Sequence, residues 1–128
     1  MTSATLGNVA VEGPLLQLHP FPSTRSLLQS FREALGLRLG VITNSGPFST
    51  EDVRSMLERA GLLTFFERTL VVTSAEAGIA KPDVKIYEFA ARRAGIATGQ
   101  CVYVGDEGDQ VAGAQAAGMG GLLKPVPT

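Results

Sequence analysis

The feature of this sequence that most restricts its fold is a regular alternation between short apolar runs and segments with helical spacing of apolar residues. Such alternation is typical of a parallel sheet with helices packed on both faces. The run at 37–42 is mostly apolar, as expected of a strand that is covered on both sides. We therefore predict an α/β fold with a mainly parallel sheet, its first strand central and its five strands at 8–11, 37–42, 69–72, 101–104 and 121–123.

Four segments between these runs carry signals for the start and end of helices. The first helix is predicted to begin after Ser23 and to end at Gly36, with an apolar face formed by Leu27, Leu28, Phe31 and Leu35. Ser49 opens a capping-box-like sequence, and Asp83 can cap the helix that follows it. We predict one three-layer domain over residues 1–128, with helices at 23–36, 49–61, 83–95 and 111–117.

Composition and charge exclude several classes of partner. The formal net charge is -1, so the chain lacks the basic surface expected of a protein that binds nucleic acid or an anionic membrane. No apolar stretch approaches membrane-spanning length, and the first residues lack the layout of a signal peptide, so we expect a cytoplasmic protein. The single cysteine, Cys101, starts an apolar run and is expected to be a buried free thiol.

Polar residues directly follow three of the predicted strands, where ligands bind in open parallel sheets. Thr43 and Asn44 follow the second strand and can donate hydrogen bonds to an anion. Lys81 precedes a helix after the third strand, and lysine is a point charge suited to phosphate. Asp106 and Asp109 follow the fourth strand, and carboxylates at that place suit a hard cation such as Mg²⁺. The pattern predicts one shared anion site.

Three segments together resemble motifs of the haloacid dehalogenase (HAD) superfamily. Residues 40–44, Gly-Val-Ile-Thr-Asn, resemble its second motif, a strand that ends in Thr or Ser. Residues 78–83, Gly-Ile-Ala-Lys-Pro-Asp, followed by Ile-Tyr, are similar to its third motif. Residues 102–106, Val-Tyr-Val-Gly-Asp, continuing to 119, resemble its fourth. The resemblance implies a HAD-like Rossmannoid sandwich in which Thr43 binds the transferring phosphoryl group, Lys81 stabilises its charge and Asp106 ligates Mg²⁺.

Two departures from the family pattern concern its catalytic carboxylates. The family's first motif is Asp-x-Asp-Gly after the first strand, but no aspartate precedes Asp52 in this chain. The counterpart that we predict, residues 10–15, places Ala10 at the nucleophile and Glu12 at the acid/base. The segment that follows Asp106 is also one residue short, so either Asp109 or Gln110 stands at the family's second acidic position.

These departures leave three hypotheses for function. In the first, a HAD-like domain binds a phosphate, a phosphorylated small molecule or a protein partner without forming a phospho-aspartate, because Ala10 cannot attack phosphorus. In the second, the chain is an active Mg²⁺-dependent phosphatase that uses a non-standard nucleophile or an activated water, with Glu12 as base. In the third, the first strand comes from another chain or was lost by truncation. The length predicts a capless member, and the missing aspartate together with the shortened segment after Asp106 predicts weak Mg²⁺ binding. An oligomer is possible.

Overall fold

The computed structural model describes residues 3–6, 9–12, 17–20 and 24–124. Its main sheet has the strand order β5–β4–β1–β6–β7, and every adjacent pair is parallel. The predicted α/β fold with a five-stranded parallel sheet is therefore confirmed. The strands of this sheet are β1 (Ser3–Leu6), β4 (Arg38–Thr43), β5 (Val71–Thr73), β6 (Cys101–Gly105) and β7 (Gly120–Leu123).

Two of the helices, α2 and α4, begin and end near the capping residues that the sequence indicates. Ser49 and Asp52 form a capping box in which each side chain accepts a hydrogen bond from the other's backbone N–H. Asp83 caps the next long helix, which ends at Gly95 with φ at 73°. No helix among the described residues is long and apolar enough to span a membrane. The α-helices are α1 (Thr24–Gln29), α2 (Thr50–Arg59), α3 (Ser74–Ala77), α4 (Val84–Ala94) and α5 (Gly108–Ala116), and 3₁₀ turns lie at Leu63–Phe65, Arg68–Leu70 and Thr98–Gln100.

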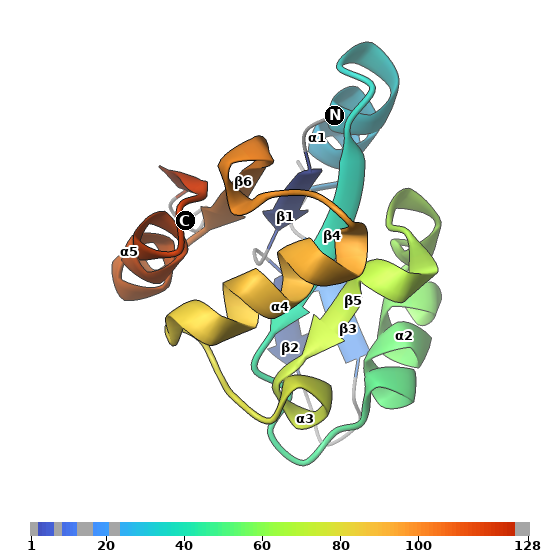
Figure 1. Ribbon diagram of the computed structural model, residues 1–128. Helices are drawn as coiled ribbons and strands as arrows, with labels where there is room; N and C mark the ends of the chain where they lie inside the picture. Colours follow the sequence, from blue (N-terminus) through green and yellow to red (C-terminus); the bar gives the residue numbers. More distant parts are fainter. Residues whose placement is uncertain (1–2, 7–8, 13–16, 21–23, 125–128) are drawn as a thin grey trace.

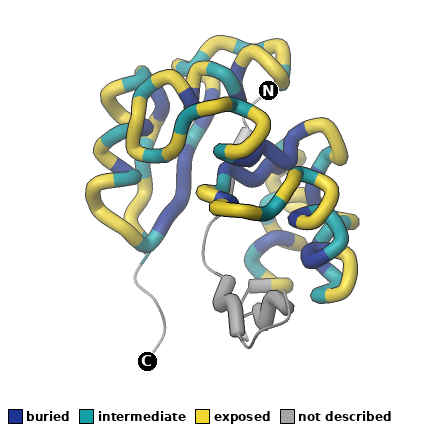
Figure 2. Tube along the Cα trace, turned by 90° about the horizontal axis from the view of Figure 1, so that it is seen from below, coloured by how far each residue is buried: buried dark blue, intermediate teal, exposed yellow. Residues whose placement is uncertain are grey.

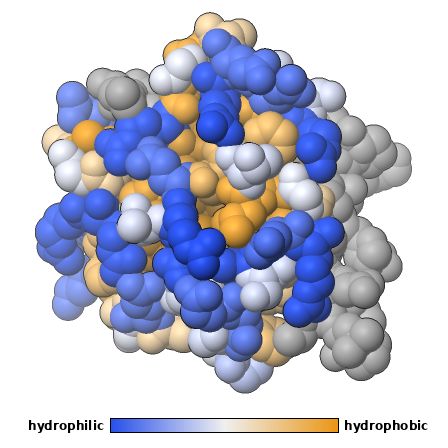
Figure 3. All heavy atoms as spheres, turned by 90° about the vertical axis from the view of Figure 1, so that its right-hand side faces the viewer, coloured by the Kyte–Doolittle hydropathy of each residue, from blue (hydrophilic) through white to orange (hydrophobic). Residues whose placement is uncertain are grey.

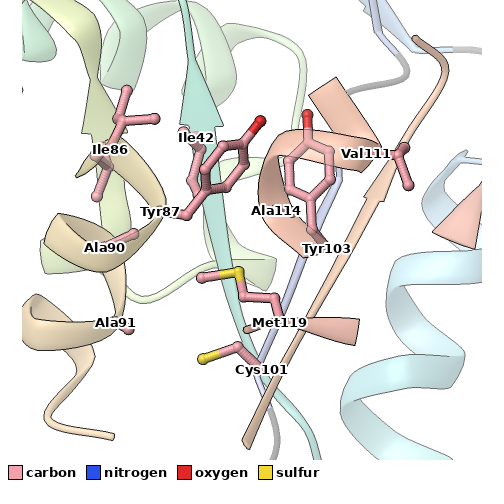
Figure 4. Packing of buried hydrophobic residues seen from close by; sticks show 11 residues of the cluster. Ile42, Ile86, Tyr87, Ala90, Ala91, Cys101, Tyr103, Val111, Ala114 and Met119 are labelled. Atoms are coloured by element: carbon pink, nitrogen blue, oxygen red, sulfur yellow. The ribbon is translucent and has the colours of Figure 1, made fainter. Parts of the chain in front are cut away.

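Each face of the main sheet has its own hydrophobic core, because successive strand residues point to opposite faces. Leu39 and Val41 of β4 pack in a cluster with residues of α1 and α2. Ile42 of the same strand packs in a second cluster with residues of α4 and α5 (Figure 4). Figure 1 shows α4 crossing in front of the sheet, and Figure 2 shows buried strand segments surrounded by exposed turns. The result is the three-layer arrangement expected from the sequence.

Helix α2 is amphipathic, as expected of a helix that covers one face of a sheet. The buried residues of α2 are Val53, Met56 and Leu57, which follow the helical repeat and point toward the sheet. On the face of the molecule toward the right-hand side of Figure 1, apolar atoms at the centre are ringed by hydrophilic side chains (Figure 3).

The position predicted for the first strand was wrong. The central strand is β1 at Ser3–Leu6, which pairs with β4 on one side and β6 on the other. Residues Val9–Glu12 instead form β2, which pairs antiparallel with β3 (Gln17–Pro20) in a separate two-stranded sheet. Both segments are short and partly apolar, so their local sequence does not distinguish them. The central place is decided by which segment pairs with the strands that follow.

This correction removes the basis for two predicted catalytic positions. Ala10 lies opposite His19 in the two-stranded sheet, and not at the carboxyl end of the central strand. The prediction that Ala10 occupies the nucleophile position therefore fails, and the acid/base role of Glu12, which depended on the same alignment, loses its support. His19 belongs to β3.

The first predicted helix also differs from the structure near its end. α1 continues into a π-helical turn at Ser30–Ala34, after which Leu35 is 64% exposed rather than facing the core. A π-turn accommodates one more residue than an α-turn, and each residue of an α-helix advances the side-chain direction by about 100°. The helical repeat that predicted a buried Leu35 is therefore out of phase at that position, while Leu28, before the turn, is 1% exposed.

Candidate anion-binding site

The carboxyl ends of β4, β5 and β6 bring together most of the residues predicted for an anion site. Thr43 is the last residue of β4 and is in register with Thr73, the last residue of β5. Asp106 directly follows Gly105, the last residue of β6. Since all these strands are parallel, their carboxyl ends lie at one edge of the sheet, the usual ligand edge of this class of fold.

Asn44 holds the backbone of Lys81. Its side-chain amide donates a hydrogen bond to the Lys81 carbonyl oxygen over 3.1 Å, and its Oδ1 accepts one from the Lys81 N–H over 2.8 Å. The two residues are thus brought together as predicted, over a separation of 37 positions in the chain. Both polar groups of the Asn44 side chain are engaged in this way. Its contribution in this structure is to fix the turn that carries the lysine.

The ammonium group of Lys81 lies against a buried tyrosine of β6. Lys81 Nζ donates a hydrogen bond to the Tyr103 hydroxyl over 3.0 Å, and it lies 5.4 Å from the centre of the Tyr103 ring. The Tyr103 hydroxyl also lies 3.4 Å from Oε1 of Gln110, near the start of α5. Tyr103 itself is only 1% exposed. The side chain of Lys81, which comes after β5 in the chain, is thereby directed toward β6.

Burial and neighbouring charges shift the pKa of Lys81 in opposite directions. Burial of the ammonium lowers the pKa of Lys81 from its usual 10.5 to about 8, while the carboxylates of Glu107, Asp106 and Asp109 act to raise it. The lysine is therefore largely charged at neutral pH but is held in a poorly solvated place. A cation of that kind is attractive to an anion, because little water has to be removed from it on binding.

Two glycines allow close packing around Tyr103 and the Lys81–Pro82 turn. A Cβ atom on Gly105 would lie 2.7 Å from the Tyr103 ring. A Cβ atom on Gly113, in α5, would lie 2.4 Å from the carbonyl oxygen of Pro82, which follows Lys81. Both distances are shorter than any normal contact. Gly105 therefore leaves room for the ring of Tyr103, two residues earlier in β6, and Gly113 lets α5 pack directly against the Lys81–Pro82 turn.

A group of hydroxyls at the same edge was not predicted as part of the site. The backbone N–H of Ser45 donates to Ser74 Oγ over 2.9 Å, and the two serine hydroxyls are 3.4 Å apart. The Thr73 hydroxyl is completely buried and lies 2.8 Å from that of Thr50. The serine contacts join the loop after β4 to the start of α3, and the threonine contact joins the start of α2 to the end of β5.

The three acidic residues whose charges act on Lys81 come from one short segment. Asp106, Glu107 and Asp109 lie at the end of β6 and the start of α5. Within the described ranges, no three His, Cys, Asp or Glu side chains are close enough together to hold a metal ion. The backbone of Glu12 belongs to the separate two-stranded sheet, and its side chain is outside the described part of the structure.

Sequence reasoning missed Tyr103 and Gln110, although both contribute to the surroundings of Lys81. Tyr103 lies within an apolar strand, where its ring is expected in the core and its hydroxyl gives no separate signal. The signal for Gln110 was its place near the second acidic position of the family pattern, and the structure gives it a contact with Tyr103 instead. Cys101 is buried, as predicted, and burial raises the pKa of its thiol.

A parallel sheet of this order, with helices on both faces, defines a Rossmann-like α/β domain. The chain belongs to the haloacid dehalogenase-like hydrolase family, which it matches over residues 5–118.

Similar proteins include both phosphatases and a dehalogenase. The chain is 40% identical to glyceraldehyde 3-phosphate phosphatase of Methanothermobacter thermautotrophicus over 107 residues, which are 83% of this chain and 45% of the relative. It is 33% identical to haloacetate dehalogenase H-2 of Moraxella sp. over 80% of this chain and 43% of that protein. The crystal structure of a HAD phosphatase from Thermococcus onnurineus superimposes with a TM-score of 0.71 at 34% identity, over 83% of this chain and 46% of that one. The chain thus spans less than half the length of these relatives.

Proposed function

We propose that this chain binds inorganic phosphate or the phosphoryl group of a phosphorylated ligand at the carboxyl edge of its main sheet. Lys81 is the principal contact in this proposal. The observation that carries it is the placement of the Lys81 ammonium, half-buried and fixed by a hydrogen bond to Tyr103, at the edge of the sheet where Thr43 ends β4. One of the three ammonium N–H groups is used by Tyr103, so two remain to donate to an anion.

The proposal extends to Thr43, whose hydroxyl would add a further donor to the anion. Relatives named as phosphatases support a phosphorylated ligand, since the glyceraldehyde 3-phosphate phosphatase matches over most of this chain. We propose a small phosphorylated molecule as ligand, with a phosphorylated protein as the alternative partner, and a cytoplasmic location.

We further propose that the chain alone does not form a phospho-aspartate. Its four aspartates are Asp52, Asp83, Asp106 and Asp109. Asp52 and Asp83 cap α2 and α4, and the other two lie beyond β6. The residues that directly follow β1 in the sequence are Gly7 and Asn8, which carry no carboxylate. Loss of a covalent nucleophile typically lowers the rate by about 10⁴- to 10⁶-fold, so we expect trace phosphatase activity at most.

Mg²⁺, which phosphatases of this family generally use, fits the described residues poorly. Asp106 is the carboxylate at the expected place, and Asp109 is near it in sequence, but the described ranges contain no group of three potential ligands. If Mg²⁺ binds, Asp106 would hold it and the ion would neutralise phosphate charge. No step proposed for this chain depends on it.

The test is titration of inorganic phosphate by calorimetry, comparing the natural chain with Lys81→Ala and Lys85→Ala. Lys85 is an exposed lysine four residues away, so its replacement changes the net charge equally. We expect saturable binding that weakens by roughly tenfold or more in Lys81→Ala, as for loss of a charged hydrogen-bond donor. Lys85→Ala should bind as the natural chain does. Equal weakening in both variants would show a non-specific charge effect and would refute the proposed site.

A phosphatase panel with Mg²⁺ tests the catalytic part of the proposal separately. We expect trace turnover at most. Robust turnover that disappears in Asp106→Asn, or stoichiometric trapping of a metallofluoride on the natural chain, would show that a nucleophile is present.

A further inference from the structure

The Tyr103 hydroxyl is a polar group in the middle of an otherwise apolar cluster. Tyr103 is 1% exposed and packs with Ile42, Val72 and Ile86 in the core between the sheet and α4. A buried hydroxyl without a partner is unfavourable, so its contacts define its role. Its hydrogen-bond partners are Lys81 Nζ at 3.0 Å and Gln110 Oε1 at 3.4 Å.

The direction of these hydrogen bonds follows from the chemistry of the groups. A charged ammonium can only donate, so the Tyr103 hydroxyl accepts from Lys81. Its own proton is then directed to Gln110 Oε1, which can only accept. Burial and the neighbouring carboxylates raise the pKa of Tyr103, so the hydroxyl stays protonated at any pH of interest. The two hydrogen bonds thus run in one direction, from Lys81 to Tyr103 and from Tyr103 to Gln110 near the start of α5.

We propose that Tyr103 is a positioning residue for Lys81, and that its hydroxyl fixes the ammonium group in the orientation in which the two remaining N–H groups face an anion at the carboxyl edge of the sheet. This inference rests on the proposed function and names a residue that determines the affinity of the same site. A free lysine side chain has several rotatable bonds, and fixing them before the anion arrives removes most of that entropic penalty from binding.

Tyr87 provides a matched comparison within the same core. The two rings pack edge to face with centroids 5.4 Å apart, and both hydroxyls point the same way (Figure 4). Tyr87 is also fully buried, but its hydroxyl donates to the Gln110 backbone carbonyl over 2.6 Å, whereas the hydrogen bond of Lys81 Nζ goes to Tyr103. Each Tyr→Phe change removes one buried hydroxyl and keeps the ring. Only the change at Tyr103 removes a partner of the lysine.

The expected effect of Tyr103→Phe is a loss of anion affinity of roughly tenfold, the size expected when one rotamer-rich side chain must be ordered during binding. The ring that Lys81 Nζ approaches is kept in this variant, so only the hydroxyl is tested. The pH dependence should also change. Removing an acceptor from a half-buried ammonium disfavours its charged form, so the pKa of Lys81 should fall below its value of about 8.

The experiment measures sulfate binding by calorimetry between pH 6 and pH 9.5 for the natural chain, Tyr103→Phe, Tyr87→Phe and Lys81→Ala. Sulfate is used because its charge does not change over this range. In the natural chain, affinity should fall as the pH rises through about 8, where Lys81 loses its proton. Tyr103→Phe should bind more weakly at pH 7 and lose affinity at a lower pH, whereas Tyr87→Phe should follow the natural chain in both respects.

The outcomes separate this inference from the proposed function. If Lys81→Ala removes binding but Tyr103→Phe keeps the affinity and the pH midpoint of the natural chain, Tyr103 is a core residue only and the inference is overturned. If Tyr87→Phe and Tyr103→Phe weaken binding equally without moving the midpoint, the effect is a general loss of packing and the inference is likewise overturned. If Lys81→Ala binds sulfate as the natural chain does, the proposed site itself is wrong.

Discussion

Replacing Gly113 with alanine tests the contact by which α5 packs against the Lys81–Pro82 turn. The added Cβ would lie 2.4 Å from the Pro82 carbonyl oxygen and 3.0 Å from the Pro82 Cβ. The oxygen belongs to the backbone and cannot rotate away as the end of a long side chain can. Either α5 or the turn must therefore move, and both lie beside the proposed anion site.

The size of the effect follows from two opposing contributions. Overpacking of a close contact typically destabilises a protein by about 1–3 kcal/mol. Glycine within a helix is itself unfavourable, so replacing it with alanine raises the free energy of unfolding by about 0.5–1 kcal/mol. We expect a net loss of about 1–2 kcal/mol in the free energy of unfolding. For a chain of 128 residues, each 1 kcal/mol corresponds to a shift in Tm of roughly 4 °C.

The assay is thermal and urea unfolding followed by circular dichroism, with Gly108→Ala as the control. Gly108 is the first residue of the same helix, and a Cβ there would meet nothing within 4 Å. Gly108→Ala should leave the stability unchanged or raise it by up to about 1 kcal/mol. Gly113→Ala should lower the Tm by roughly 4–8 °C and also weaken phosphate binding. A Gly113→Ala protein as stable as Gly108→Ala would refute the contact between α5 and Pro82.

Two further changes test the surroundings of Lys81. Because the pKa of Lys81 is lowered to about 8 in the folded state, the unfolded chain binds more protons between pH 8 and 10.5, and stability should rise with pH across that window. Lys81→Met should therefore be more stable than the natural chain at pH 7, by at most about 3 kcal/mol. Urea unfolding should show that this difference in stability shrinks at pH 10. An equal difference at both pH values would contradict the burial of the charge. Asn44→Ala should lower the free energy of unfolding by about 1–2 kcal/mol, since two hydrogen bonds to Lys81 are lost. Asn44→Asp keeps the acceptor for the Lys81 N–H but sets a second oxygen against the Lys81 carbonyl, so it should also be destabilised, and natural stability in both variants would show that the turn is held by other contacts.

The parts of the fold that the sequence predicted are those determined by local chemistry. Ser49 and Asp83 cap helices because their side-chain oxygens reach backbone N–H groups two or three residues ahead. Gly95 ends α4 because its φ of 73° is one that other residues rarely adopt. These features depend on neighbours within a few positions and were located to within a residue or two.

The first strand was misplaced because its position depends on distant partners. Residues 3–6 and 9–12 are both short and partly apolar. Only pairing with β4 and β6 selects the first of them as the central strand, and a glycine and a glutamate near Ala10 gave a misleading alignment to the first family motif. An error of a few residues there changes which side chain stands at the end of the strand.

The candidate site shows the same difference between features that depend on near neighbours in the sequence and features that depend on distant partners. Thr43, Lys81 and Asp106 were predicted because each follows a strand, and the parallel arrangement of the strands places their ends at one edge. Tyr103 was missed because its hydroxyl meets a partner from a segment 22 residues earlier in the chain. A pattern within one strand cannot distinguish a tyrosine that only fills the core from one that also holds a lysine.

The position of Lys81 depends on three separate parts of the fold. Asn44, after β4, holds its backbone, and Tyr103, within β6, accepts a hydrogen bond from its ammonium. Gly113 of α5 allows that helix to pack on the next residue, Pro82. Because these contacts come from distant points of the chain, the lysine takes this place only when the whole sheet and α5 are assembled. Loss of α5 packing should therefore weaken anion binding before the protein unfolds, and that order of events is what a site built from tertiary contacts requires.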